Sequence, residues 1–189
     1  MVPTEKIRLK GLKKTFLAAQ GPVPVLDSID FYALEGEFVS IIGPSGCGKS
    51  TLLGIIAGLE EPDAGAVELD GKPAPRRLGM VGYMPQKDLL LPWRTVLDNA
   101  ILPQELQGVP RHQARKQALE MMEPFGLGGF ERQYPSTLSG GMRQRAAFLR
   151  TVLAGRDILL LDEPFGALDA LTRTQMQEWL LNLWDSLKK

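Results

Sequence analysis

Residues 43–50 constrain the fold of this chain more than any other segment. They match the pattern G-x-x-x-x-G-K-[ST] completely, with the residues Gly43, Pro44, Ser45, Gly46, Cys47, Gly48, Lys49 and Ser50. The apolar run at 38–42 predicts a buried strand before them, and an apolar helix is predicted after them, from about Lys49 to Leu59. In such a strand–loop–helix unit the glycines let backbone N–H groups surround an anion, and the helix N-terminus adds positive potential. The alternative is an incidental lysine in a glycine-rich turn, and this context argues against it.

The segment therefore predicts a nucleotide-binding loop. Lys49 is expected to reach the β- and γ-phosphates, and the hydroxyl of Ser50 is expected to coordinate Mg²⁺. Cys47 is expected to be a small spacer that alkylating reagents can reach when ATP is absent. Thr51, the next residue of the predicted helix, is also expected to bind the nucleotide.

Two adjacent carboxylates, Asp162 and Glu163, follow the apolar run at 158–161. That run predicts a parallel strand covered on both faces, and open α/β sheets place their ligand sites at the carboxyl ends of such strands. Asp162 can hold Mg²⁺ directly or through water, and Glu163, which points elsewhere, can polarise an attacking water. The alternative is a solvated strand end. The phosphate loop upstream favours the metal site.

Hydrophobic periodicity predicts an antiparallel β part near the N-terminus. Apolar residues alternate at Ile7 and Leu9, and again at Ile29 and Phe31. Alternation at 67 and 69 runs into Asp70-Gly71, which indicates a hairpin turn.

The middle of the chain changes to a helical pattern after a strand predicted at about 80–84. The pattern from Gln86 to about Gly129 is interrupted by prolines, and further helices are predicted at about 139–154 and 171–187. We interpret the chain as a single α/β domain, 1–189. Its P-loop NTPase core would comprise about 1–86 and 155–189, with an inserted helical lobe at about 87–154.

Composition excludes several function classes. Twenty-two basic residues balance twenty-two acidic ones without long blocks of one sign, so we expect no nucleic-acid partner. The single cysteine cannot form an internal disulfide, which fits a reducing compartment. No apolar run approaches the roughly 18–20 residues that span a bilayer, so a membrane would be reached only through a partner. His112, the only histidine, lies in a polar run and is expected to be a solvated helix residue.

Residues 138–145, with the sequence LSGGMRQR, contain a second candidate anion-binding helix end. Ser139 is a natural N-cap, and Gly140 and Gly141 open the following helix to an anion. Together with the phosphate loop and the strand end at 162–164, this segment resembles the ABC-type ATPases. The resemblance covers nearly the whole chain. It implies a head-to-tail dimer in which residues 139–141 of one subunit reach the γ-phosphate of an ATP held by the other; an ordinary capped helix is the alternative.

Three further positions resemble functional residues of that family. Phe16 resembles the aromatic residue that stacks on adenine, although an isolated phenylalanine is more often a core residue. Gln86 resembles the glutamine that senses Mg²⁺ and the attacking water, an assignment that depends on the resemblance alone. Asp169 resembles the aspartate that crosses the dimer interface, and it can also be the N-cap of the last helix.

The resemblance also suggests partners. Residues 89–96, with the sequence LLLPWRTV, and Asn99 are similar to the ATPases of nitrate, sulfonate and taurine importers. Met142 fits the same group, which includes some pyrimidine-precursor importers. Trp93 would then lie near the groove that receives a helix of the membrane-spanning permease, although a tryptophan is often buried core. A solute-binding protein would act indirectly, and the chain would lie on the cytoplasmic face of the membrane.

The chain departs from the family in one respect. ABC ATPases carry a histidine that contacts the γ-phosphate on a strand after the helix that closes this sequence, and His112 lies elsewhere. We therefore expect a C-terminally truncated form with impaired hydrolysis. Two other functions stay open: a nucleotide-binding module without hydrolysis of its own, and a non-transport ABC ATPase acting on DNA or ribosomes. The long coiled-coil insertions, second cassette or basic patches of the last class are absent from the sequence.

Overall fold

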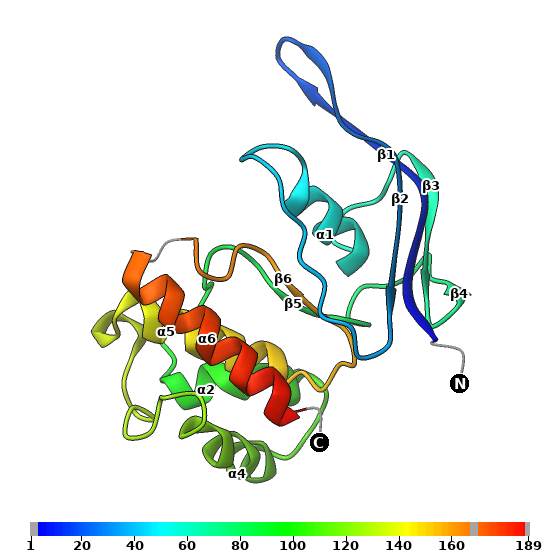
Figure 1. The fold of residues 1–189 in the computed structure, drawn as a ribbon. Coiled ribbons are helices and arrows are strands. Elements are labelled where there is room, and N and C mark those ends of the chain that lie inside the picture. Colours follow the sequence, from blue (N-terminus) through cyan, green and yellow to red (C-terminus); the bar gives the residue numbers. More distant parts are fainter. Residues whose placement is uncertain (1–3, 167–169, 188–189) are drawn as a thin grey trace. The chain divides into compact units, whose positions relative to one another are not determined.

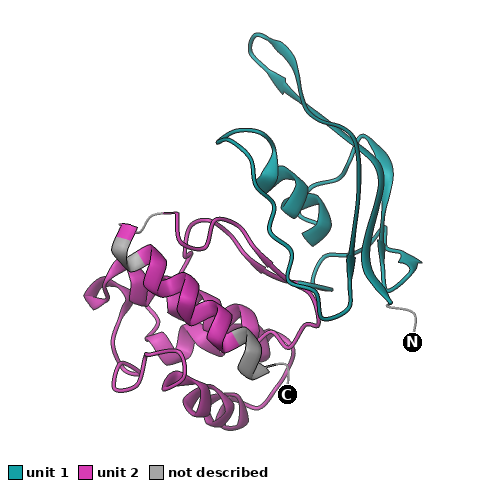
Figure 2. Ribbon diagram, viewed as in Figure 1, with its two compact units in different colours: residues 1–81 teal, residues 82–189 magenta. Residues whose placement is uncertain are grey.

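The computed structural model describes residues 4–166 and 170–187, and its elements are labelled in Figure 1. The chain forms two compact units, residues 1–81 and residues 82–189, shown in teal and magenta in Figure 2. The boundary between the two units thus lies between residues 81 and 82. The boundaries predicted for the helical lobe were near residues 87 and 154. The single-domain organisation stays a prediction.

Unit 1 contains an antiparallel sheet with the strand order β2-β1-β3-β4. Its strands are β1 (Glu5–Ala18), β2 (Gly21–Leu34), β3 (Ala64–Leu69) and β4 (Lys72–Pro73), and its helix is α1 (Lys49–Ala57). The predicted alternation is confirmed, because Ile7 and Leu9 of β1 are buried and pair with residues of β2 and β3. Leu12 and Val67 continue the buried set, and Ile55 comes from α1. The antiparallel β part of the predicted fold is therefore present.

The turn between β3 and β4 is the predicted hairpin. Asp70 has φ 51° and Gly71 has φ 70°. Two consecutive residues with positive φ match the turn whose twist fits a two-residue hairpin. The aspartate–glycine pair thus explains the local geometry, since both residue types tolerate the left-handed region.

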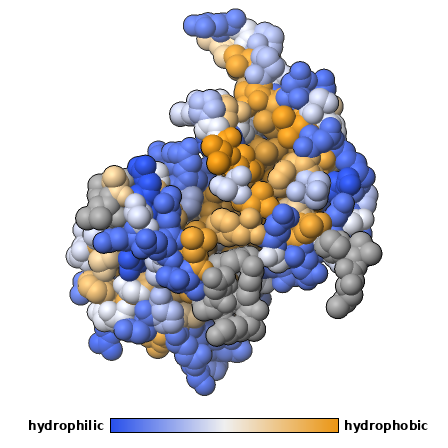
Figure 3. Space-filling model, in the orientation of Figure 1, coloured by the Kyte–Doolittle hydropathy of each residue, from blue (hydrophilic) through white to orange (hydrophobic). Residues whose placement is uncertain are grey.

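The prediction of a buried strand at 38–42 is wrong. In the described part of the chain these residues belong to no strand, and Ile42 is 92% exposed. An apolar run favours β structure only when neighbouring strands complete its hydrogen-bond ladder, and the four strands of unit 1 pair among themselves. In Figure 3, which has the orientation of Figure 1, apolar side chains gather on the exposed face of unit 1.

Unit 2 combines one short parallel strand pair with helices. The strands are β5 (Gly82–Met84) and β6 (Leu159–Leu161), and β5 is the C-terminal part of the strand predicted at 80–84. The helices are α2 (Val96–Ala100), α3 (Leu102–Leu106), α4 (Arg111–Met122), the 3₁₀ helix Pro135–Thr137, α5 (Gly140–Val152) and α6 (Ala170–Leu187). The helical character predicted after Gln86 is confirmed.

The core of unit 2 joins these helices. Ala114, Ala118 and Met122 of α4 are buried in it. Three aromatic rings pack together at its end: Phe125 lies 5.7 Å from Phe148 and 5.3 Å from Trp179, measured between ring centroids. Such edge and tilted contacts stabilise a core beyond the area that they bury. They attach α6 to α5 and to the end of α4.

Candidate functional site

The phosphate loop lies in unit 1 and ends where α1 begins. The ammonium of Lys49 turns back into the loop and donates to the carbonyl oxygens of Gly43 and Pro44, at 3.0 Å each. The backbone N–H of Cys47 donates to Pro44 O at 3.3 Å. The loop therefore surrounds the lysine Nζ, with the N-terminus of α1 beside it. This is the arrangement in which a helix end and a cation can hold an anion together.

Two glycines of the loop have conformations that other residues avoid. Gly46 has φ 82° and Gly48 has φ 99°. A Cβ at Gly48 would lie 3.0 Å from side-chain carbons of Val25 and Leu26. A side chain at this position would therefore strain the backbone and displace β2, which explains the glycine directly before Lys49.

The second half of the predicted site lies in unit 2, at the ends of β5 and β6. The two strands run parallel, so their carboxyl ends meet. The backbone N–H of Asp162 donates to Met84 O at 2.9 Å, which continues the pairing by one residue. The carboxamide of Gln86 donates from Nε2 to Glu163 Oε2 at 2.9 Å. The structure thus brings together Gln86 and Glu163, which are 77 positions apart in the sequence.

Asp162 is buried, with 4% of its surface exposed. The hydroxyl of Tyr83, on β5, donates to Asp162 Oδ2 at 3.3 Å. Burial and the neighbouring Asp162 carboxylate raise the pKa of Tyr83 to about 12. Tyr83 therefore stays protonated near neutral pH and can keep this hydrogen bond to the carboxylate. Tyr83 was not predicted as a site residue. Its only signal in the sequence was its position within the strand predicted at 80–84, whose pairing with β6 the structure shows.

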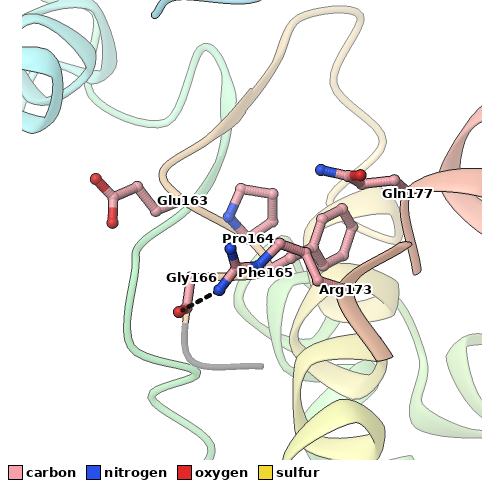
Figure 4. Close-up of a pocket in the computed structure, with 6 residues that line it drawn as sticks. All are labelled: Glu163, Pro164, Phe165, Gly166, Arg173 and Gln177. Atoms are coloured by element: carbon pink, nitrogen blue, oxygen red, sulfur yellow. Dashed lines mark hydrogen bonds between the residues drawn. The ribbon is translucent and has the colours of Figure 1, made fainter. Parts of the chain in front are cut away.

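Glu163 has a strained backbone, with φ 46°. A non-glycine residue in this region is uncommon and is found repeatedly at functional sites. The turn that follows is closed by the N–H of Gly166, which donates to Glu163 O at 3.0 Å. Figure 4 shows this turn at a pocket of about 400 Å³, with the Glu163 carboxylate directed away from the other labelled side chains. The pocket is lined by Glu163, Pro164, Phe165, Gly166, Arg173 and Gln177.

The predicted N-cap at Ser139 is confirmed. The hydroxyl of Ser139 accepts a hydrogen bond from the backbone N–H of Met142 at 3.3 Å, and α5 begins at Gly140. This leaves Gly140 and Gly141 in the first turn of a 13-residue helix. Such a turn can offer backbone N–H groups to an anion without obstruction from side chains.

The remaining predicted residues have varied surroundings. Phe16 of β1 is 38% exposed, and the Nζ of Lys14 lies 5.3 Å from its ring centroid, so Phe16 is not a core residue. Trp93 is 72% exposed, which excludes the core alternative for it as well. His112 is exposed on α4, as expected. Asp169 lies outside the described residues.

Comparison with known proteins identifies the family. A sequence model of the ABC transporter family matches residues 26–166. The chain belongs to the ABC transporter family. That span contains the phosphate loop, the LSGG segment and the carboxylates, so the resemblance noted in the sequence is confirmed.

Two curated relatives of this ABC chain are named as import proteins. A formylaminopyrimidine import ATP-binding protein of Halalkalibacterium halodurans is 48% identical over 88% of this chain and 64% of the relative. An aliphatic sulfonates import ATP-binding protein of Bacillus cereus is 43% identical over 96% of this chain and 71% of the relative. The ABC chain thus spans about two thirds of their length.

The solved structures agree with the predicted fold class. An ATP-binding cassette, described as a dimer in a post-hydrolysis state bound to ADP and Pi, superposes with a TM-score of 0.82. It is 34% identical to the ABC chain, with 95% of this chain and 83% of that chain covered. The P-loop ABC fold is therefore established. None of the helices within residues 4–166 and 170–187 is both long and apolar enough to cross a bilayer.

Proposed function

We propose that this chain is the ATP-binding and ATP-hydrolysing subunit that supplies energy to an ABC importer. The solute would be nitrate, a sulfonate, taurine or a similar small molecule. The observation that carries the proposal is the Gln86–Glu163 hydrogen bond at the paired strand ends, beside the buried Asp162. A carboxylate with a carboxamide at 2.9 Å can accept a proton from water while the carboxamide orients that water.

The phosphate loop supports nucleotide binding. Lys49 donates to two loop carbonyls, and these weak partners can be exchanged for phosphate oxygens, which form stronger charge-assisted hydrogen bonds. The half-exposed ring of Phe16 offers a face on which an adenine can stack. The bound nucleotide would thus be held by residues 43–51 at its phosphates and by Phe16 at its base.

The described residues fit a magnesium ion in chemistry. Ser50 and Asp162 offer hydroxyl and carboxylate oxygens, which are the ligands that Mg²⁺ prefers, and Gln86 adds an amide oxygen. Protein carboxylates bind this ion best together with substrate phosphates, which a phosphate loop supplies. When bound, the ion would neutralise charge on the β- and γ-phosphates.

Catalysis would depend on positioning and on charge. Glu163 would take the proton of the attacking water, Gln86 would orient that water, and Lys49 would stabilise the charge on the γ-phosphate. The second subunit would contribute Ser139, Gly140, Gly141 and Asp169 to the same nucleotide. The solved cassette described as a dimer supports such a pair.

The partners follow from this function. The import proteins among the relatives support a permease that binds the helical part of the chain. Trp93 and Leu89, which are 72% and 59% exposed, are the proposed contacts with a permease helix. The chain would then be a peripheral protein on the cytoplasmic face of the membrane, and a solute-binding protein would act on it indirectly.

ATP binding and turnover by the purified protein with Mg²⁺, with and without its permease, test the proposal. Glu163→Gln keeps the acceptor oxygen for Gln86 but removes the charge, so ATP binding should persist while turnover falls by about two orders of magnitude. Glu120→Gln, an exposed position on α4, is the matched control and should change neither.

The possible outcomes separate the alternatives. Turnover in Glu163→Gln equal to that of the unmodified chain would contradict the role of Glu163. Binding without any turnover, even with the permease, would favour a nucleotide-binding module. Salt-dependent binding of DNA or RNA would favour a non-transport ABC ATPase.

A further inference from the structure

Arg143 of α5 connects two segments that the proposed function assigns to different nucleotides. Its Nε donates to Asp88 Oδ2 at 3.2 Å, and its Nη1 donates to Leu138 O at 2.8 Å. Asp88 lies two residues after Gln86, and Leu138 directly precedes Ser139. One guanidinium therefore holds both the segment that carries the glutamine and the segment that caps α5.

A second arginine strengthens the attachment of the same segment. Arg150 donates to Leu89 O at 2.7 Å and to Asp88 O at 2.5 Å. Arg143 and Arg150 are seven residues apart, so they project from the same face of α5. Leu89 has φ 45°, a conformation that a leucine adopts only when its surroundings enforce it. The two arginines thus fix residues 88 and 89 to the helix.

The fixed segment limits the reach of Gln86. Adjacent Cα atoms are about 3.8 Å apart, and only Lys87 lies between Gln86 and the anchored Asp88, so the Gln86 carboxamide has little freedom. The side chain of Asp88 also accepts from Leu90 N at 3.1 Å, which stiffens the turn after it. A displacement of α5 would therefore be transmitted to the 2.9 Å hydrogen bond between Gln86 and Glu163.

We propose that Arg143 is a positioning residue that makes the Gln86 segment and the Ser139 helix end move as one body. This inference rests on the proposed function, in which Gln86 acts on the nucleotide of its own subunit and Ser139 on that of the partner. Closure of the partner's site would then be transmitted through Arg143 to the Gln86–Glu163 hydrogen bond of this subunit. Arg143 couples the two sites without touching either nucleotide.

A purely structural role for Arg143 predicts a different result. The core of unit 2 already holds α5 through buried Ala146, Ala147 and Leu149. The Arg143–Asp88 pair is partly exposed at its ends, and such pairs contribute little to the free energy of folding. Removing Arg143 should thus leave the fold intact and change the alignment of Gln86.

The experiment compares Arg143→Ala with Arg132→Ala, which removes an exposed arginine of the same unit. In the ATPase assay Arg143→Ala should lower kcat by about tenfold or more, because misplaced catalytic groups lose that much. ATP affinity and the melting temperature should stay unchanged. Arg143→Lys, which keeps the charge, should recover part of kcat, and Arg132→Ala should behave like the unmodified chain.

A double-mutant cycle identifies the contact. Asp88→Asn keeps the acceptor for Leu90 but weakens the pair, so the double variant should lose no more activity than Arg143→Ala alone. Additive losses would overturn the assignment of this contact. An unchanged kcat in Arg143→Ala, or a loss that follows a lowered melting temperature, would overturn the inference.

Amide hydrogen exchange tests the coupling without hydrolysis. Arg143→Ala should raise exchange at 86–91 and at 138–141 together, whereas Arg132→Ala should raise neither. Faster exchange in one segment only, or in neither, would contradict the coupling. This readout also separates the two proposals: a chain without turnover fails the proposed function, while its exchange still decides the role of Arg143.

Discussion

Tyr83 of β5 donates a hydrogen bond to Asp162, the residue directly after β6, with 3.3 Å between the phenol oxygen and Oδ2. A buried carboxylate is costly unless hydrogen bonds compensate for its lost water. The hydrogen bond from Tyr83 therefore stabilises the buried carboxylate that the proposed function assigns to Mg²⁺. No sequence motif identifies Tyr83 as part of the site.

The ionisation of Tyr83 should be displaced to high pH. Its pKa in the folded protein is about 12, raised by burial and by Asp162 from an ordinary value of 10.0. A raised pKa means that the stabilisation is complete below about pH 10 and is lost as the pH rises towards 12. The difference in phenolate absorbance between the unmodified chain and Tyr83→Phe should show this transition. A midpoint near pH 10 in the folded protein would contradict a buried phenol beside the Asp162 carboxylate.

Asn99→Ala should destabilise unit 2 by about 3 kcal/mol, because buried backbone groups lose their partners. Asn99 is fully buried, and its Oδ1 accepts from Leu91 N at 2.7 Å. Its Nδ2 donates to the carbonyl oxygens of Leu91, Arg94 and Thr95 at 3.0–3.1 Å. Urea unfolding measures the loss, with Gln113→Ala on the exposed face of α4 as the control. Equal urea midpoints for both variants would show that the Asn99 carboxamide does not stabilise the backbone of residues 91–95.

Cys47 should report on occupation of the phosphate loop. It is the only cysteine and is exposed, so a maleimide should label it at a single site. ATP with Mg²⁺ should slow labelling by about tenfold or more at saturation, since bound phosphates cover the loop. Lys49→Ala should abolish this protection. Because Lys49 Nζ lies 4.0 Å from Cys47 Sγ, each variant is compared with its own labelling rate without nucleotide. If ATP did not change the labelling rate of the unmodified chain, nucleotide binding at residues 43–50 would be contradicted.

Sequence patterns were sufficient for the local parts of the structure. The glycine-rich loop before α1, the Asp70-Gly71 hairpin and the Ser139 cap depend on residues near one another in the chain, and each was predicted correctly. The strand expected at 38–42 was wrong because strand formation depends on partners that the segment itself does not encode. Arg143 lay within the LSGG segment, yet its contact with Asp88 joins residues 55 positions apart and depends on how α5 packs. The roles of Gln86, Phe16 and Asp169, and the expected weak hydrolysis, stay predictions.

The left-handed backbone conformation of Glu163 affects which residues evolution can favour at this position. Holding a glutamate at φ 46° costs about 1 kcal/mol or more, which a glycine would recover. Selection for stability alone would therefore replace the residue on which the proposed reaction depends. The chain keeps a less favourable amino acid at this turn, as expected where activity and thermodynamic robustness oppose each other.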